Sequence, residues 1–371
     1  MIRTIRLGDY IDVLTDYHSG GSYKTLKENT KILYKPDYAV MVRTLNFENN
    51  DFESDLIYCD KKSYEFLSYS HVEENDILMN KIANAGSVYI MPKVDYHVTC
   101  GMNLFLIRLK NINQKYMYYV MKHNEKYIKS QAHGTTTTTI TKEEVRNLEF
   151  TIDDDPIVQN RIVNILDSIE CQITNNRIMV QKLQVLAHNT FDYFSKDNND
   201  NNTVILKDII IEKQKSPIQV NNIFNSLGNI PFYTSGESIL YTNKSLEDGF
   251  NIFLSTGGNA KVQSYYGKVS YSTDTWCISA KNNLYFYLYG YLKHIESQMD
   301  KLYFHGTGLK HLQKPILLKS IIKIPNEELL KRYNIIVEPI YNQISKIEQN
   351  IIILQKIKKQ LLPLLINHQL I

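Results

Sequence analysis

Residues 162–187 read IVNILDSIECQITNNRIMVQKLQVLA, and apolar side chains recur along this stretch every three or four positions. The spacing averages about 3.5 residues, which is typical of a helix that packs lengthwise against a second helix. Asn176 is the polar interruption of this apolar line. We therefore expect a long helix from about residue 157 to about residue 194. The line consists of Ile162, Leu166, Ile169, Ile173, Val180, Leu183 and Ala187.

A second apolar line with the same spacing lies near the end of the chain. Asn326 followed by two glutamates is a start signal for its helix, which we expect to run from about residue 327 to about residue 369. Lys358 is the polar interruption here. Two matched lines in one chain most simply pair with each other, so the sequence predicts an antiparallel coiled coil. The second line consists of Val337, Ile340, Ile344, Ile347, Ile351, Leu354, Leu361 and Leu365.

The chain contains an internal duplication. His133-Gly134-Thr135 and His305-Gly306-Thr307 lie 172 residues apart, since 305 minus 133 is 172. The apolar lines of the two helices repeat with almost the same offset, because Leu166 and Val337 are 171 residues apart. Two independent patterns with one offset indicate a unit of globular segment plus long helix that occurs twice, related by a pseudo-two-fold.

The globular segments mix alternating apolar runs with turn signals, so the predicted fold class is α+β. The run Leu104-Phe105-Leu106-Ile107 is compatible with a strand or a short buried helix, and so is Tyr285-Phe286-Tyr287-Leu288. Ten tyrosines occur between residues 233 and 303, among them the alternating Tyr285, Tyr287, Tyr289 and Tyr291, and we expect most of the ten to be half-buried strand residues. The expected domains are residues 1–155, a helix and linker at 156–198, residues 199–325, and a helix at 326–371.

Composition and motifs exclude several classes of protein. The 371 residues carry a net charge of +3 and four widely spaced cysteines, which argues against a polycation and against a zinc ribbon or disulfide framework. We find no stretch of 18 apolar residues and no signal peptide, so a cytoplasmic protein without membrane contact is expected. Phosphate-loop, HExxH and GxSxG motifs are absent, and the ten histidines show no ligand spacing. We therefore expect no catalytic residues, cofactor or metal in this chain.

Several stretches together carry a resemblance to a known family. A tyrosine segment precedes an apolar strand and a glycine turn, and the His-Gly-Thr loop closes the first globular segment. The combination resembles the specificity subunit of type I restriction-modification systems over essentially the whole chain. The stretches are Tyr64–Leu67, Glu74–Met79 with Ala85–Ser87, His133–Thr135, Asp155–Gln159 leading into Ile162, and Gly228–Gly236.

The resemblance implies a non-catalytic reader of double-stranded DNA. Its two globular segments would be target recognition domains, each reading one half of a bipartite asymmetric site, spaced by the paired helices. Two methyltransferase subunits would dock on the chain and methylate adenine with S-adenosylmethionine. Restriction subunits, where present, would add translocation and cleavage driven by ATP with Mg²⁺. Such a complex defends the cell against foreign DNA.

Polar loops of the first globular segment supply candidate DNA contacts. Hydroxyl and backbone N–H groups of the loop 133–139 suit phosphate oxygens, although a threonine-rich edge strand explains the same residues. Arg43 follows an apolar run and suits guanine, although a surface ion pair is the simpler role. Turn chemistry alone accounts for Asn84. The candidates are Arg43, Thr44, Lys81, Asn84, Ser87, His133, Gly134, Thr135, Thr136 and Thr137.

The second globular segment offers a corresponding set of loops with fewer hydroxyl groups, so a different half-site is expected. The candidates are Ser255, Thr256, Asn259, Lys261, Gln263, His305 and Lys310. Outside the helix seam, Ile352, Ile353 and Leu362 predict an apolar surface for a partner protein. The alternative function is a structural coiled-coil scaffold that binds other proteins through its globular ends. A standalone methyltransferase or nuclease is disfavoured by the missing motifs.

Overall fold

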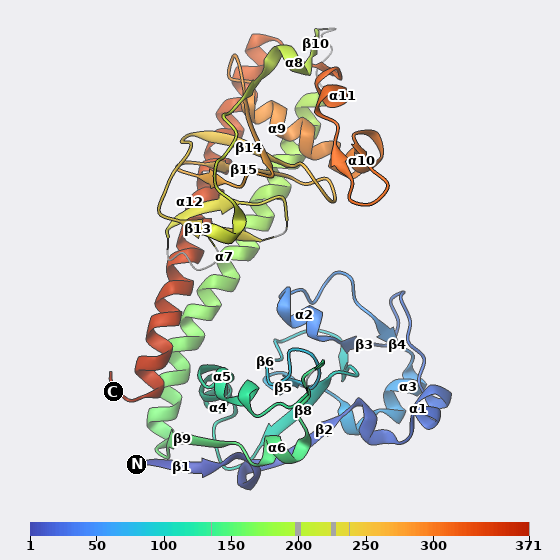
Figure 1. Ribbon diagram of the computed structural model, residues 1–371, viewed down its shortest axis with the longest axis vertical. Coiled ribbons are helices and arrows are strands. Elements are labelled where there is room, and N and C mark those ends of the chain that lie inside the picture. The colour runs from blue at the N-terminus through green and yellow to red at the C-terminus, as the bar shows by residue number, and fades with distance from the viewer. Residues whose placement is uncertain (135, 197–201, 224–227, 237, 371) are drawn as a thin grey trace. The chain divides into compact units, whose positions relative to one another are not determined.

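The computed structural model describes residues 1–134, 136–196, 202–223, 228–236 and 238–370. The chain forms two compact units. Unit 1 contains Met1–Ile169 and Lys358–Ile371, and unit 2 contains Glu170–Ile357. Sheets and short helices occur in both units, which confirms the α+β class (Figure 1).

Both long helices are present at the expected places. Helix α7 spans Pro156–Lys196 and helix α12 spans Glu327–Ile366. A preceding side chain caps the first turn of each helix, since Ile157 N donates to Asp155 Oδ1 at 2.8 Å and Leu329 N donates to Asn326 Oδ1 at 2.8 Å. These side-chain acceptors satisfy backbone N–H groups that the first helical turn leaves without partners.

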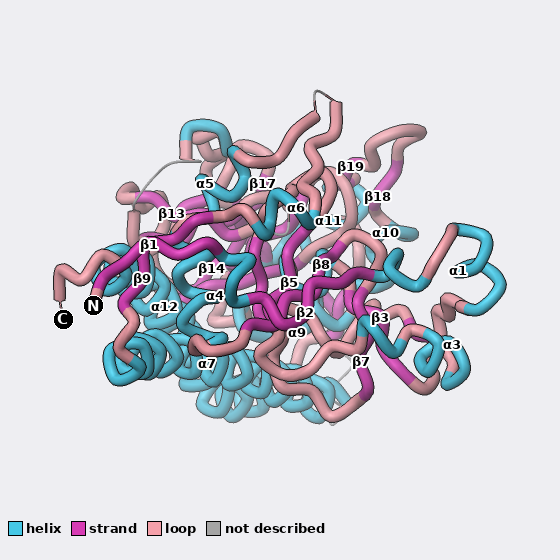
Figure 2. Tube along the Cα trace, turned by 90° about the horizontal axis from the view of Figure 1, so that it is seen from below, coloured by secondary structure: helices cyan, strands magenta, loops and turns pink. Residues whose placement is uncertain are grey.

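Helices α7 and α12 pack together in antiparallel orientation. In unit 1, Ile162 and Leu166 near the start of α7 share a buried cluster with Leu365 near the end of α12. In unit 2 the opposite ends meet, because the rings of Phe194 and Tyr333 lie 5.5 Å apart. The two helices lie side by side in both ribbon and tube views (Figures 1 and 2). The predicted pairing of the two apolar lines is confirmed.

Unit 1 contains a four-stranded antiparallel sheet and a three-stranded sheet that includes one parallel pair. Their strand orders are β2 (Ile11–Asp16), β8 (Leu104–Leu109), β5 (Ile77–Asn80), β6 (Val88–Ile90), and β4 (Tyr58–Cys59), β3 (Ala39–Val42), β7 (His97–Cys100). Strand β1 (Ile2–Arg6) pairs with β9 (Glu149–Asp153) beside them (Figure 2). The helices are α1 (Tyr23–Asn29), α2 (Thr44–Glu48), α3 (Lys61–Phe66), α4 (Gln114–His123), α5 (Glu125–Ser130) and α6 (Lys142–Arg146).

Unit 2 repeats this strand order. Its sheets run β11 (Ile210–Glu212), β17 (Thr275–Ala280), β14 (Phe250–Ser255), β15 (Val262–Tyr266), and β13 (Ile239–Thr242), β12 (Ile230–Tyr233), β16 (Ser270–Tyr271). The pair β12/β16 is parallel, as β3/β7 is in unit 1. Strands β10 (Thr203–Ile205) and β20 (Ile321–Lys323) pair like β1 and β9. The remaining elements are α8 (Leu206–Ile209), α9 (Tyr285–His294), α10 (Glu296–Leu302), β18 (Phe304–His305), β19 (His311–Leu312) and α11 (Lys314–Leu318).

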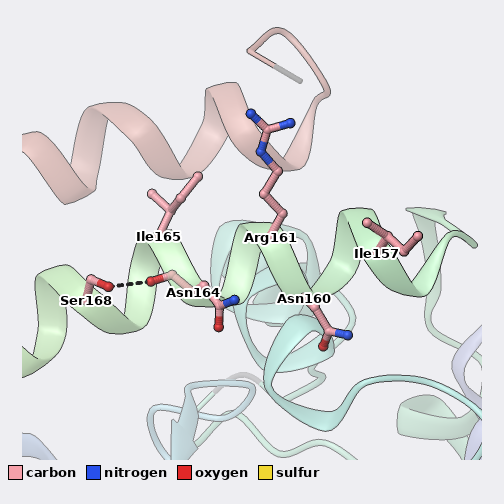
Figure 3. A pocket seen from close by; sticks show the side chains of 6 residues that line it. All are labelled: Ile157, Asn160, Arg161, Asn164, Ile165 and Ser168. Atoms are coloured by element: carbon pink, nitrogen blue, oxygen red, sulfur yellow. Dashed lines mark hydrogen bonds between the residues drawn. The ribbon is translucent and has the colours of Figure 1, made fainter.

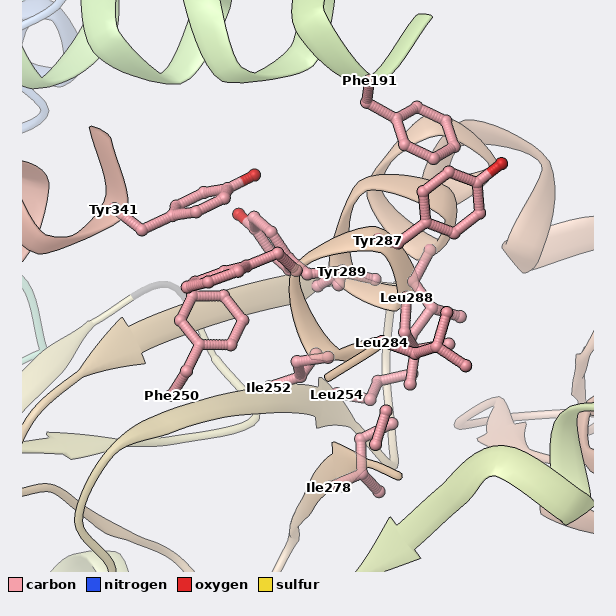
Figure 4. Packing of buried hydrophobic residues seen from close by; sticks show 14 of the residues in the cluster. Phe191, Phe250, Ile252, Leu254, Ile278, Leu284, Tyr287, Leu288, Tyr289 and Tyr341 are labelled. Carbon is pink, nitrogen blue, oxygen red and sulfur yellow. The ribbon is translucent and has the colours of Figure 1, made fainter. Parts of the chain in front are cut away.

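The tyrosine-rich segment corrects one expectation. Residues 285–294 form helix α9, so the expectation of strand residues is wrong for the four tyrosines of this segment. Five of the ten tyrosines between 233 and 303 do lie in strands, namely Tyr233, Tyr241, Tyr265, Tyr266 and Tyr271. Six of the ten residues in α9 are buried, and its rings fill the core of unit 2 between Phe250 and Tyr341 (Figure 4). A helix buried on most sides has no polar face and therefore shows no amphipathic period. By contrast, Leu104–Ile107 lies in strand β8.

Candidate nucleic-acid interface

In unit 1, the loops that follow β3, β5 and β7 meet at one place. Lys81 N, after β5, donates to Asn103 O, after β7, at 2.8 Å. Thr44 Oγ1, after β3, donates to Asn80 Oδ1 at the end of β5 at 3.1 Å. The parallel pairing of β3 with β7 brings their carboxyl ends to the same edge. Residues distant in sequence therefore form one loop cluster.

The His-Gly-Thr loop is a hairpin that docks on this cluster. His133 and Thr139 exchange two backbone hydrogen bonds of 2.8 Å each. The hairpin then joins the loop after β5, because Ile140 N donates to Lys81 O at 3.0 Å and Ala83 N donates to Thr138 O at 2.9 Å. Four backbone hydrogen bonds thus fix the loop, and the hydroxyl groups of Thr138 and Thr139 add donations to Ala83 O and His133 O.

Gly134 is required by the backbone of this hairpin. Its φ is +126°, and a Cβ at this position would lie 2.3 Å from Thr137 O. In unit 2, Gly306 has a φ of +154°, and its Cβ would lie 2.6 Å from Leu309 O. Only glycine adopts these conformations without strain, so both hairpins turn in the same way.

Unit 2 contains the same cluster. Thr256 N donates to Asp274 O at 3.3 Å, Leu312 N donates to Thr256 O at 3.1 Å, and Gly258 N donates to Lys310 O at 2.9 Å. These three bonds correspond to the bonds that involve Lys81, Asn103, Ala83, Thr138 and Ile140 in unit 1. His305 likewise pairs with His311, as His133 pairs with Thr139.

The two clusters share a backbone frame but differ in their side chains. Lys81, Thr138 and Asn103 of unit 1 occupy the places that Thr256, Lys310 and Asp274 occupy in unit 2. At these equivalent places a lysine corresponds to a threonine, a threonine to a lysine, and an asparagine to an aspartate. Two surfaces with one shape and different chemistry can distinguish two different sequences of hydrogen-bonding groups.

The predicted DNA-contact residues of unit 1 differ in how much of their surface is exposed. Asn84, His133, Gly134, Thr136 and Thr137 are exposed, whereas Thr135 lies outside the described residues. His133 Nε2 lies 3.0 Å from Glu144 Oε1. Ser87 is 3% exposed, so its side chain is not accessible at the surface.

Arg43 and Thr44 begin helix α2 and are both engaged within the unit. The Arg43 guanidinium donates to the backbone oxygen of Asp55 and lies 3.9 Å from its carboxylate. Arg43 N donates to Asn46 Oδ1 at 2.8 Å. The arginine therefore emerges at the end of β3 as expected, and its head group already has an acidic partner.

The unit 2 candidates surround the loop after β14. Ser255 is buried, with its hydroxyl donating to Asn259 O at 2.7 Å, and Thr256 Oγ1 donates to Asp274 O at 2.6 Å. Lys261 N donates to Ser255 Oγ at 3.0 Å. Asn259, His305 and Lys310 are exposed, while Lys261 and Gln263 are half-buried. Gln263 lies within strand β15 and lines a cavity below the loop.

Sequence reasoning missed the loops after β7 and β16. Met102 is 41% exposed beside Asn103, and in unit 2 the Ser235 hydroxyl donates to Asp274 O. Their place directly after a strand could have identified them, because Met102 and Asn103 follow the short strand β7 as Arg43 and Thr44 follow β3. These residues complete the edge that each cluster presents.

A buried ion pair supports the unit 1 cluster. Burial alone would raise the pKa of Asp16, but hydrogen bonds from Lys81, Ser19 and Lys142 lower this pKa to about 2. Lys142 Nζ lies 3.0 Å from Asp16 Oδ1. Asp16 therefore holds both lysines in place, and Lys81 serves the unit interior rather than its surface.

Unit 2 also contains a cavity of about 590 Å³ between α7, α9, α12 and β15. Glu348 lines it, and burial raises the pKa of this carboxyl group to about 7. In unit 1, a shallow groove follows the first turns of α7, where Ile157 and Arg161 stand out from one helix (Figure 3). Both hollows lie outside the two hairpins described above.

Comparisons with known proteins agree with the duplication. The sequence matches the family described as type I restriction modification DNA specificity domain over residues 4–183 and again over residues 198–361. Comparison with curated protein sequences finds no match. The family match does not favour the alternative of a coiled-coil scaffold.

Three solved structures are similar to this chain at low sequence identity, and the first of them shares its fold. The S subunit of the type I restriction-modification system from M. genitalium is 15% identical, with a TM-score of 0.61 over 99% of this chain and 96% of that chain. The HsdS subunit from Thermoanaerobacter tengcongensis is 13% identical, with a TM-score of 0.35 over 98% of this chain and 96% of that chain. A chain described under assembly and conformational transition of the type I R-M system is 12% identical, with a TM-score of 0.41 over 98% and 97%.

The family match covers both repeats, and the structure gives each repeat the same frame of strands, hairpin and long helix. The two matched segments, 4–183 and 198–361, each contain one loop cluster. The chain therefore belongs to the type I restriction-modification DNA specificity domain family and contains that domain twice.

Proposed function

We propose that this chain is the non-catalytic specificity subunit of a type I restriction-modification complex and reads a bipartite, asymmetric site on double-stranded DNA. One observation carries the proposal: the two loop clusters repeat the same backbone hydrogen bonds with different side chains. A shared frame presents each cluster to DNA in the same manner, and the exchanged side chains make the two half-sites different.

Within each cluster we assign DNA contact to the exposed residues. Hydroxyl and backbone N–H groups at Thr136 and Thr137 suit phosphate oxygens, and Lys310 adds a positive charge at the matching hairpin of unit 2. Asn84 and Asn259 carry amides that can pair with base edges. Lys81, Ser87 and Ser255 are buried, so we assign them the support of these loops.

We further propose that two methyltransferase subunits dock on the paired helices. Exposed apolar side chains on α7 support a docking surface, because burying them against a partner is favourable. Ile353 of α12 belongs to this set with 51% exposure, whereas Ile352 is 5% exposed and Leu362 packs against the core of unit 1, so the expectation for these two is wrong. The exposed large apolar residues of α7 are Ile157, Ile178, Met179, Val185, Leu186 and Tyr193.

In this proposal the partners supply the chemistry. The methyltransferase subunits would transfer a methyl group from S-adenosylmethionine to adenine, and restriction subunits would use ATP with Mg²⁺. The chain itself would hold neither cofactor. We place the complex in the cytoplasm with the cellular DNA; no helix in the described part of the chain is long and apolar enough to span a bilayer.

Co-production of the full chain with a type I adenine methyltransferase subunit tests this function. Sequencing of methylated bases across the genome should show methylated adenine in a motif of two parts. Asn84→Ala should relax one part and Asn259→Ala should relax the other, because both amides are assigned to base edges. A stable complex that methylates no adenine, or a variant that alters both parts alike, would contradict the proposal.

A further inference from the structure

Two histidines and one aspartate meet in unit 2 at the junction of α7 and α9. His188 and Asp192 are four residues apart on α7, so they lie on one face of the helix. His294 is the last residue of α9. Its Nδ1 lies 2.9 Å from Asp192 Oδ1, and His188 Nε2 lies 3.6 Å from Asp192 Oδ2.

The three side chains present ligand atoms at a separation suited to a small cation. One atom from each lies within 4.8 Å of the other two. Zinc binds imidazole nitrogen and carboxylate oxygen at about 2.0–2.2 Å, so tetrahedral ligands are about 3.4 Å apart. The observed separations bracket this value. A small rotation of the side chains, which are 41%, 29% and 51% exposed, brings all three into range.

The helices that carry these ligands are held rigidly together. Gly290 of α9 allows the close approach, because a Cβ there would lie 2.5 Å from Phe191 Cδ2. The ring of Phe191 also packs 5.1 Å from the ring of Tyr287 (Figure 4). The rings of Phe191 and His294 lie 5.9 Å apart. Because the ligands are already close together, the entropic cost of ordering them around a metal ion is reduced.

The local charge favours a cation. His294 stands at the carboxyl end of α9, where the helix dipole and the unsatisfied carbonyl groups are negative. The neighbouring cation Lys293 is paired with Glu296 and also donates to Val262 O at 3.3 Å. Asp192 supplies a carboxylate between the two imidazoles. A bound ion would therefore meet one negative ligand and little local repulsion.

We propose that His188, Asp192 and His294 form a binding site for Zn²⁺ that ties α9 to α7. Sequence spacing places only His188 and Asp192 together, since the third ligand His294 lies 102 residues beyond Asp192. Two nitrogen ligands and one oxygen ligand match the donor preference of zinc, and water completes a fourth position at this partly exposed place. The ion adds a link between the second globular segment and its long helix.

Calorimetric titration of the full chain, first freed of metal by a chelator, tests the site with Zn²⁺ alone. We expect one equivalent to bind and the melting midpoint of the chain to rise with added zinc. His188→Ala and His294→Ala should each weaken binding about tenfold or more. Asp192→Asn keeps the shape of the side chain and should also weaken binding, which separates loss of a ligand from loss of the fold.

His133→Ala is the matched control, because His133 also pairs with a carboxylate at 3.0 Å but forms no described three-ligand cluster. This variant should retain the full affinity. The absence of one-equivalent binding would overturn the proposal. Unchanged affinity in His294→Ala and Asp192→Asn would overturn it as well, as would equal loss in His133→Ala.

Discussion

Lys81 Nζ donates a hydrogen bond to Asp16 Oδ2 at 2.5 Å, and the two side chains are only 10% and 9% exposed. The pair joins the end of β2 to the loop after β5, on which the hairpin 133–139 docks. A lysine that the sequence offers as a DNA contact is thus the buried support of the loops around it.

Lys81→Met should destabilise unit 1 by about 3 kcal/mol, because it leaves a buried carboxylate with fewer partners. The low pKa of Asp16 in the folded state, about 2 against 3.8, stabilises the fold above pH 4, and this contribution is lost as the pH falls towards 2. The free energy of unfolding of the variant and the parent, measured by urea unfolding between pH 3 and pH 8, tests both expectations. Equal stability of variant and parent at neutral pH would contradict the assignment.

Glu348→Gln should stabilise unit 2 at pH 8 by about 2 kcal/mol. Burial raises the pKa of this carboxyl group from 4.5 to about 7, so the folded state holds its proton more tightly than the unfolded state. Stability should therefore fall as the pH rises through this window, and the variant should not show the fall. Thermal melting at pH 5 and pH 8 checks this, with the exposed Glu328→Gln as a control.

Gly290→Ala should destabilise unit 2 by about 1–3 kcal/mol through overpacking, although alanine favours helices. The added Cβ would meet the ring of Phe191 at 2.5 Å. Gly308→Ala is a suitable comparison, because a Cβ at Gly308 meets nothing within 4 Å. Chemical denaturation of both variants gives the difference, and a stabilised Gly290→Ala would show that α9 and α7 pack less closely.

Lys310→Glu should weaken binding to duplex DNA and reduce the salt dependence of the binding constant by about one phosphate contact. Lys310 is exposed at the hairpin of unit 2. Lys207→Glu changes the same charge on α8, outside the loop cluster, and should have a smaller effect. Titrations of the assembled complex at several salt concentrations compare them. Equal slopes for both variants would remove Lys310 from the interface.

The long helices were predictable because their apolar lines repeat over about ten turns, and a repeat of that length is typical of paired helices. Helix α9 was not predictable, since Phe286, Leu288 and Leu292 are buried together with the tyrosines beside them. Because helix α9 has no polar face, the alternating tyrosines in its sequence resemble the pattern of a strand. Pattern reading depends on contrast between two faces, and a buried helix lacks that contrast.

The candidate site was predictable in its loops but not in its side-chain partners. The hairpin was recognisable from its glycine and hydroxyl residues, whose conformational needs are local. The burial of Lys81 depends on Asp16, which lies 65 residues away in the sequence. Likewise, Arg43 meets Asp55 only because an intervening helix and loop fold back. Long-range pairs of this kind carry no local signal.

The hairpins 133–139 and 305–311 are held by backbone hydrogen bonds and by one glycine each. Mutations at exposed positions such as Thr136, Thr137 and Lys310 therefore change the exposed chemistry at little cost to the architecture. Natural selection can alter the preference of one half of the protein while the other half is inherited unchanged. Lineages that carry this scaffold are thus able to diversify step by step.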